Sequence, residues 1–199
     1  LEDQDFWRLH GLFRSVELAA RPHVHIENTQ IEADWDPEAG TASLDAALTV
    51  LNAADAATVR ATLKDADGNT VMKAEPTVVR RTISRETSET AISSGPLQGI
   101  APWSAESPTL YELDVDVIDQ AGDVIECTSQ KVGFRRFRIE DGILTINGKR
   151  IVFKGADRHE FDAERGRAIT EQDMIDDVVF CKRHNINSIR TSHYPNQER

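Results

Sequence analysis

"ASLDAALTVL" (residues 42–51) alternates apolar or small side chains with more polar ones. Successive side chains of a β-strand point to opposite faces, so every second residue from Ala42 to Val50 would share one face of an extended strand. Two later stretches, "TVRATLK" (58–64) and "YELDVDVID" (111–119), show the same period of two. The positions expected to face inward are Ala42, Leu44, Ala46, Leu48, Val50, Val59, Ala61, Leu63, Tyr111, Leu113, Val115 and Val117. Glu112, Asp114 and Asp116 are expected to face water.

Turn-forming stretches separate these strands. "DPEAG" (36–40), "DADGN" (65–69) and "DQAGD" (119–123) all combine aspartate with glycine, which tight turns favour, and the first two add proline or asparagine. Trp103 lies between two prolines in what we expect to be an irregular connection. Short strands joined by such turns, without helical stretches from about Phe13 to Arg138, predict an antiparallel β-sandwich of immunoglobulin type.

The pattern changes after Arg138. Asn147-Gly148 indicates a hairpin, and the apolar run Ile151–Phe153 predicts a strand after it. "TEQDMIDDVVFCKRHN" (170–185) predicts a helix, with Thr170 as N-cap and Asp173 completing a capping box. "INSIR" (186–190) predicts the next strand. Strand, helix and strand make one βαβ unit with parallel pairing, which begins an α/β domain and leaves apolar surface exposed.

Composition narrows the classes of partner. The chain has 199 residues and a net charge of -11, which repels phosphate backbones and anionic lipid, so we expect neither nucleic acid nor a membrane as partner. No run approaches the ~20 apolar residues of a membrane span. Cys127 and Cys181 show no metal-site spacing and are expected to be buried free thiols, which favours a cytoplasmic location.

Three polar clusters are candidates for chemistry. The first is "LEDQDFWR" (1–8), whose spacing alone favours a solvated acidic stretch. "GADRHEFD" (155–162) and "RTSHYPN" (190–196) each follow a strand of the predicted βαβ unit. Consecutive parallel strands end at one edge, where α/β barrels place their sites, so both histidine-bearing loops should open onto one rim. The alternative for the second cluster is a structural ion pair between Arg158 and Glu160.

These stretches carry a family resemblance. "NSIRTSHYPN" (187–196) resembles the first signature of the glycoside hydrolase family that holds bacterial β-galactosidases, β-glucuronidases and β-mannosidases. "VGFRRFRIEDGILTINGKRIVFKGADRHE" (132–160) resembles that family's passage from its sandwich into its catalytic barrel, and "LEDQDFWRLHGLFRSVEL" (1–18) resembles the end of its N-terminal sugar-binding jelly roll. The resemblance implies three parts: the jelly-roll tail at 1–20, the sandwich at 21–137, and the truncated start of a (β/α)8 barrel at 138–199.

The resemblance also implies an activity. Arg-His-Glu at 158–160 and the "DQD" and "WR" motifs of the first eight residues are similar to β-galactosidases, although Asp157 stands where that pattern usually has asparagine. The implied parent is a retaining β-galactosidase that removes terminal β-D-galactose. Its acid/base and nucleophile would lie beyond Arg199, so this chain alone should be inactive.

The same resemblance implies roles for individual residues. His159 and His193 would bind galactose hydroxyls, and Asp5, preferred over Asp3, would reach the sugar and a sodium ion. Magnesium and sodium are expected in the full-length enzyme, together with a homo-oligomeric state. The supporting residues would be Arg158, Glu160 and Arg190, the last of which would orient its loop or pair with a carboxylate.

Two other hypotheses stay open. The sandwich could be a stand-alone carbohydrate-binding or adhesion module whose tail merely resembles a barrel start. Within the family, the parent could instead be a β-glucuronidase.

Overall fold

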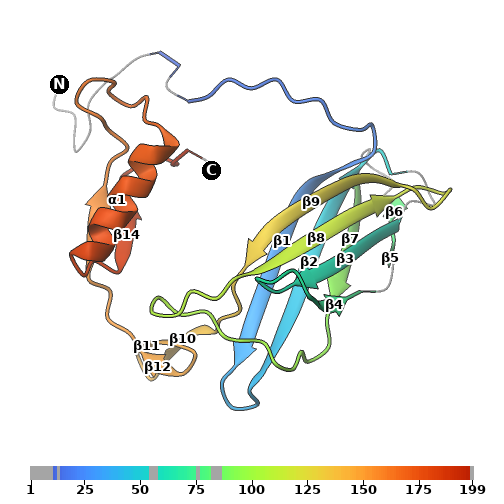
Figure 1. Ribbon diagram of the computed structural model, residues 1–199, viewed down its shortest axis with the longest axis horizontal. Coiled ribbons are helices and arrows are strands. Elements are labelled where there is room, and N and C mark those ends of the chain that lie inside the picture. Colours follow the sequence, from blue (N-terminus) through green and yellow to red (C-terminus); the bar gives the residue numbers. More distant parts are fainter. Residues whose placement is uncertain (1–10, 13, 54–57, 75–76, 82–86, 198–199) are drawn as a thin grey trace. The chain divides into compact units, whose positions relative to one another are not determined.

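The computed structural model describes residues 11–12, 14–53, 58–74, 77–81 and 87–197 (Figure 1). They divide into two compact units. One comprises Ala20–Ile151, and the other joins the described residues up to Ala19 with those from Val152 onward. The predicted limits of the three parts, at 20/21 and 137/138, remain predictions.

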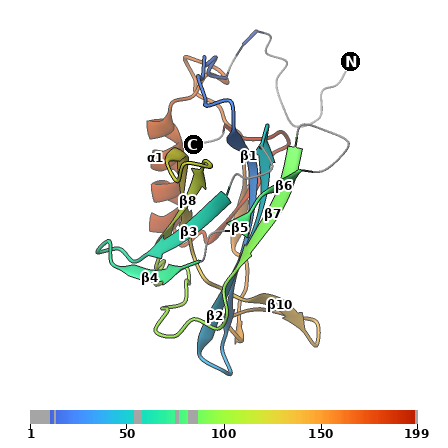
Figure 2. The ribbon, with the colours of Figure 1, turned by 90° about the vertical axis from the view of Figure 1, so that its right-hand side faces the viewer.

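The larger unit is a sandwich of two antiparallel sheets (Figures 1 and 2). The first sheet has the order β1-β2-β7-β6, and the second has the order β4-β3-β8-β9 with β5 paired to β3. The first comprises β1 (His25–Asp36), β2 (Thr41–Leu51), β7 (Thr87–Ser93) and β6 (Arg80–Arg81). The second comprises β4 (Thr70–Lys73), β3 (Thr58–Lys64), β8 (Tyr111–Ile118), β9 (Val124–Val132) and β5 (Thr77–Val78). Consecutive strands that switch between two such sheets form an immunoglobulin-like sandwich, as predicted.

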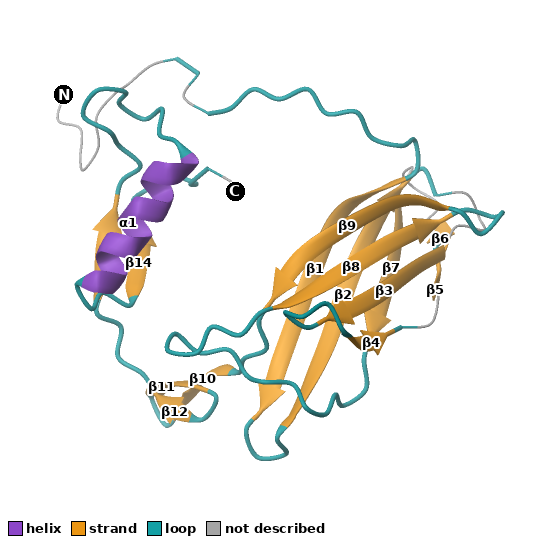
Figure 3. Ribbon diagram, in the orientation of Figure 1, coloured by secondary structure: helices purple, strands orange, loops and turns teal. Residues whose placement is uncertain are grey.

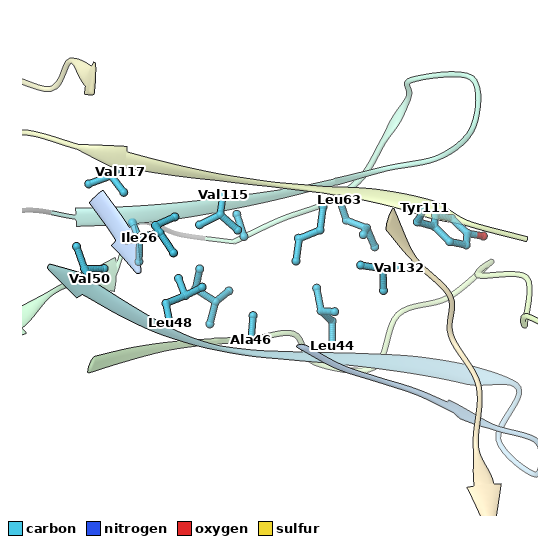
Figure 4. Close-up of a cluster of buried hydrophobic side chains, with 14 of the residues drawn as sticks. Ile26, Leu44, Ala46, Leu48, Val50, Leu63, Tyr111, Val115, Val117 and Val132 are labelled. Carbon is cyan, nitrogen blue, oxygen red and sulfur yellow. The ribbon is translucent and has the colours of Figure 1, made fainter. Parts of the chain in front are cut away.

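The core lies between these sheets and consists of the residues that the alternation selected. Figure 4 shows Leu44 and Leu48 of β2 facing Leu63 of β3 and Val115 of β8. All twelve positions expected to face inward are buried. Fully burying one such branched aliphatic side chain contributes about 1.5–3 kcal/mol, so these strands provide most of the driving force for this fold.

The outer face of the second sheet carries paired charges. Glu112, Asp114 and Asp116 are partly exposed, as predicted, and each faces a cation on a neighbouring strand. The carboxylate–ammonium distances are 2.6 Å for Glu112–Lys131 and 2.5 Å for Asp114–Lys64, and Arg60 lies 2.5 Å from Asp116. The hydrogen bond from Lys64 is the main reason that the pKa of Asp114 is lowered.

Both cysteines are free thiols, as predicted, but the expectation that both are buried is wrong. Cys127 is exposed, because the alternation of β9 places it beside Asp116 on the outer face of the sheet. Local desolvation, reinforced by the Asp116 carboxylate, raises the pKa of its thiol to about 11. This exposed thiol is therefore a weak nucleophile at neutral pH.

A small three-stranded sheet follows the sandwich within the same unit. It consists of β10 (Phe137–Glu140), β11 (Ile143–Ile146) and β12 (Lys149–Arg150). The predicted hairpin at Asn147-Gly148 joins β11 to β12, and both residues have positive φ, of 51° and 73°. The Asn147 side chain accepts a hydrogen bond from the Arg136 N–H (2.9 Å) and donates one to the carbonyl of Trp103 (3.1 Å).

Trp103 is packed tightly against the chain near the end of the sandwich. The connection that carries it has no regular secondary structure, as predicted. Its backbone N–H donates to the Phe134 carbonyl (2.8 Å), and the Arg135 guanidinium lies 4.7 Å from its ring centre. A Cβ atom added at Gly133 would come within 2.9 Å of the Trp103 ring. Glycine is therefore required at position 133 for steric reasons.

Gly133→Ala is expected to lower the free energy of unfolding of the sandwich by about 1–3 kcal/mol, the usual cost of overpacking. Gly95→Ala is the matched control, because a Cβ there meets no atom within 4 Å and its φ is not positive. Urea denaturation followed by circular dichroism measures both variants. Equal stabilities of the two variants would contradict the steric role of Gly133.

The smaller unit contains the predicted βαβ segment (Figure 3). It consists of β13 (Gly155–Arg158), α1 (Glu171–Arg183) and β14 (Ser188–Thr191), with β13 and β14 parallel. Thr170 caps α1 through a capping box with Asp173, as predicted. The strand predicted at Ile151–Phe153 is wrong, because the chain pairs with β14 only from Gly155 onward.

Apolar side chains of this unit remain exposed, as predicted. No residue of α1 is buried, and the exposed large hydrophobic residues of the unit include Val152, Phe153, Phe161, Ile175, Val178, Val179 and Phe180. The described residues contain no helix long and apolar enough to cross a membrane.

Candidate functional site: two histidine loops at one strand edge

The parallel pairing of β13 and β14 decides which side chains meet. Asp157 lies opposite Arg190 and Arg158 opposite Thr191, so both strands end at the same level. The Ser192 N–H then donates to the Arg158 carbonyl (3.0 Å), which extends the ladder by one more bond. The residues that follow the two strands therefore emerge side by side, as the sequence predicted.

His159 and His193 are neighbours at this edge. Their ring centroids are 5.8 Å apart and the rings are almost perpendicular. His159 is half-buried and His193 is exposed. A neutral imidazole has one donor and one acceptor nitrogen, so two adjacent imidazoles offer the alternating partners that vicinal sugar hydroxyls need.

Tyr194 holds the His159 loop against the His193 loop. Its hydroxyl accepts from the Glu160 N–H (3.0 Å) and donates to the Glu160 carbonyl (3.3 Å), and its ring centre lies 6.1 Å from that of His159. The Arg167 guanidinium covers the Tyr194 ring at 4.6 Å, within cation–π range. No role was predicted for Tyr194, although it follows His193 directly in the signature.

Glu160 is completely buried, which the sequence analysis did not predict. Its carboxylate lies 2.6 Å from Arg14 and 3.5 Å from Arg158. The contact with Arg158 is the structural ion pair that the sequence analysis kept as an alternative. The contact with Arg14 was missed, because nothing in "GLFRSV" (11–16) distinguishes a buried arginine from an exposed one.

Arg158 and Arg190, the two arginines predicted as supporting residues, each pair with an aspartate. Arg158 Nε donates to Asp177 of α1 (2.8 Å), which ties the helix to the end of β13. Arg190 pairs with Asp157 at 3.2 Å, and both side chains are more than half exposed. Exposed pairs of this kind contribute about 0–1 kcal/mol, so the Arg190 pair adds little to stability.

A turn after Glu160 leads the chain into α1. Hydrogen bonds from the Arg165 side chain and from backbone N–H groups lower the pKa of Asp162 to about 2. Arg165 also contacts Asp173 of the capping box at 2.8 Å. The turn is thus fastened at both ends, which limits the conformations open to the loop that carries His159.

Metal ligation was predicted only for Asp5, which lies outside the described residues. Among the residues described, no three His, Cys, Asp or Glu side chains gather in an arrangement that could hold a metal ion. No chemical step here is assigned to magnesium or sodium.

Comparisons with known proteins identify the family of the chain. The model described as "Glycosyl hydrolases family 2" matches residues 24–135, and the one described as "Glycosyl hydrolases family 2, TIM barrel domain" matches residues 137–199. The chain is 63% identical over 203 aligned positions to β-galactosidase BgaC of Bifidobacterium adolescentis. That alignment covers 100% of this chain and 19% of BgaC. It is 46% identical to a β-galactosidase of Streptococcus thermophilus, again over 100% of this chain and 18% of the relative.

Among solved structures, the β-glucuronidase of Parabacteroides merdae resembles the chain with a TM-score of 0.75 at 23% identity. The match covers 88% of this chain and 22% of the glucuronidase, and it supports the fold. The chain spans about a fifth of the length of the curated relatives named above. With matches on both sides of residue 136, the chain belongs to glycosyl hydrolase family 2, as a sandwich domain followed by the start of a TIM barrel.

Proposed function

We propose that the chain is part of a retaining β-galactosidase that hydrolyses terminal non-reducing β-D-galactose residues of β-galactosides. The observation that carries the proposal is the juxtaposition of His159 and His193, 5.8 Å apart at the carboxyl edge of two parallel strands. The β-galactosidase names of its relatives at 63% and 46% identity support the choice of substrate.

The two histidines act by binding. Hydrogen bonds to sugar hydroxyls that strengthen as the ring flattens toward an oxocarbenium ion lower the barrier, because they favour the transition state over the ground state. His159 is oriented by the Tyr194–Glu160 backbone bonds, so its imidazole needs little reorganisation when the sugar arrives. Asp5 is proposed as a further sugar ligand and as a sodium ligand.

The acid/base and the nucleophile come from elsewhere in the enzyme. A retaining glycosidase needs two carboxyl groups roughly 5 Å apart across the scissile bond. The carboxylates nearest the histidines in sequence are Asp157, which is paired with Arg190, and Glu160, which is buried against Arg14. The exposed apolar face of α1 supports the same proposal, because the further helices and strands of a complete barrel would cover it.

The comparisons favour this hypothesis over the other two. Hydrolase family models match both parts of the chain, which argues against a stand-alone adhesion module. The β-glucuronidase likeness is at 23% identity and concerns the fold, so it does not favour glucuronides as substrates.

The experiment is a substrate comparison with the full-length enzyme that carries this chain. Its kcat/KM for 4-nitrophenyl β-D-galactoside is expected to exceed that for the β-D-glucuronide by about 100-fold or more, since polar groups built to bind one sugar are left unpaired by the other. Higher activity on the glucuronide would overturn the galactosidase proposal. Heat-inactivated enzyme is the control.

Three finer features complete the proposal. We propose a reducing, cytoplasmic location, which the two free thiols support. We also propose magnesium and sodium as ions of the full-length enzyme, and a homo-oligomeric state for it.

A further inference from the structure

Glu160 is an ionisable group in a place that water does not reach. Its side chain has 0% exposure, whereas the neighbouring His159 remains accessible. Moving an unpaired carboxylate into such a site costs several kcal/mol, so a buried glutamate must be neutralised by a partner or by a proton. Its partners therefore indicate what the residue does.

Those partners come from three separate stretches of chain. Arg14 Nη2 lies 2.6 Å from Oε2, and Arg158 Nη1 lies 3.5 Å from Oε1. The backbone N–H of Gln197 lies 3.2 Å from both carboxylate oxygens. With both oxygens occupied, Glu160 is poorly placed to exchange a proton with a substrate, and a positioning role fits its environment better.

Arg14 also reaches the loop that carries the second histidine. The same Nη2 atom donates to the carbonyl of Pro195 (3.1 Å), two residues after His193. A further bond, from Gln197 Nε2 to Ser15 Oγ (3.3 Å), joins the same two stretches. One guanidinium thus contacts the residue that follows His159 and the loop that follows His193.

We propose that Arg14 is a positioning residue of the glycosidase site, which clamps Glu160 and the Pro195 carbonyl and so fixes the two histidines relative to each other. The inference rests on the proposed function, which gives the two histidines their role. It adds Arg14, from the N-terminal stretch, to the residues that position them. Tyr194 also joins the two loops, through two hydrogen bonds between its hydroxyl and the Glu160 backbone.

The test uses Arg14→Met in the full-length enzyme. Misplacing a binding group by about 1 Å can cost about 100-fold in rate, so we expect kcat/KM on the galactoside to fall about 10- to 100-fold, mainly through kcat. Arg14→Lys keeps the positive charge but lacks the planar guanidinium with its several donors. It should therefore recover part of the kcat/KM that Arg14→Met loses. Arg21→Met is the matched control, because it removes an arginine from a pair with Glu126 (2.7 Å) in the sandwich and should leave kcat/KM unchanged.

A double-variant comparison separates positioning from simple destabilisation. Arg14→Met leaves the buried Glu160 carboxylate without its nearest positive charge, at 2.6 Å, and only Arg158, at 3.5 Å, remains. Glu160→Gln removes the buried negative charge. Because the two side chains are in contact, the losses in kcat/KM caused by Arg14→Met and by Glu160→Gln should not add up in the double variant.

Additive losses in Arg14→Met, Glu160→Gln and Arg14→Met/Glu160→Gln, or a lower melting temperature of Arg14→Met with unchanged kcat/KM of the folded enzyme, would overturn the proposal. If the wild type prefers another glycoside, the proposed function fails. The clamp is then tested by the same comparison on that glycoside.

Discussion

The 199-residue polypeptide, purified alone, is expected to release no nitrophenol from 4-nitrophenyl β-D-galactoside above the rate of a buffer blank. Enzymes of this kind accelerate hydrolysis by at least about 10⁶-fold over water, so the expected difference from the full-length enzyme is very large. The physical reason is that the proposed acid/base and nucleophile belong to other parts of the enzyme. Among the described residues near the histidines, Asp157 is held by Arg190 and Glu160 by Arg14.

Contamination by a host galactosidase is the main risk in that assay. The double variant His159→Ala/His193→Ala of the same polypeptide is the control, because a contaminant is indifferent to it. Turnover that survives repurification and disappears in the double variant would contradict the prediction.

Replacing either histidine by alanine in the full-length enzyme is expected to lower kcat/KM on the galactoside by about 100-fold or more. Each change leaves a sugar hydroxyl without its hydrogen-bond partner in the enzyme–substrate complex. The two losses should not be additive, because the rings are only 5.8 Å apart and would contact one substrate.

Steady-state kinetics of the two single variants and the double variant measure these effects. His23→Ala is the matched control, because His23 is exposed in the sandwich unit and should leave kcat/KM unchanged. Near-wild-type activity of the variants at position 159 or 193 would contradict the binding role.

Much of the fold follows from local patterns. The period of two in "ASLDAALTVL" selects the buried face of β2, and Thr170 with Asp173 marks the start of α1, because both signals depend on neighbours in sequence. The strand predicted at Ile151–Phe153 shows the limit of such signals. β-branched residues favour extended structure in general, yet the ladder forms where β14 offers a partner, from Gly155 onward.

The site was predictable in part. The order of the strands and their parallel direction were enough to predict that His159 and His193 lie at one edge. The contacts between Arg14 and Glu160, and between Tyr194 and the Glu160 backbone, were not predictable. They join residues 146 and 34 positions apart, and neither pair has a spacing that sequence periodicity detects. Asp5 lies outside the described residues, so its role remains a prediction.

A crystal structure of the full-length enzyme with a galactose-shaped transition-state inhibitor would show directly whether both histidines bind the sugar. We expect an imidazole nitrogen of His159 and one of His193 within about 3 Å of the inhibitor's hydroxyl groups, the usual hydrogen-bond distance. An inhibitor bound in the catalytic site with both imidazoles beyond hydrogen-bond reach would contradict it.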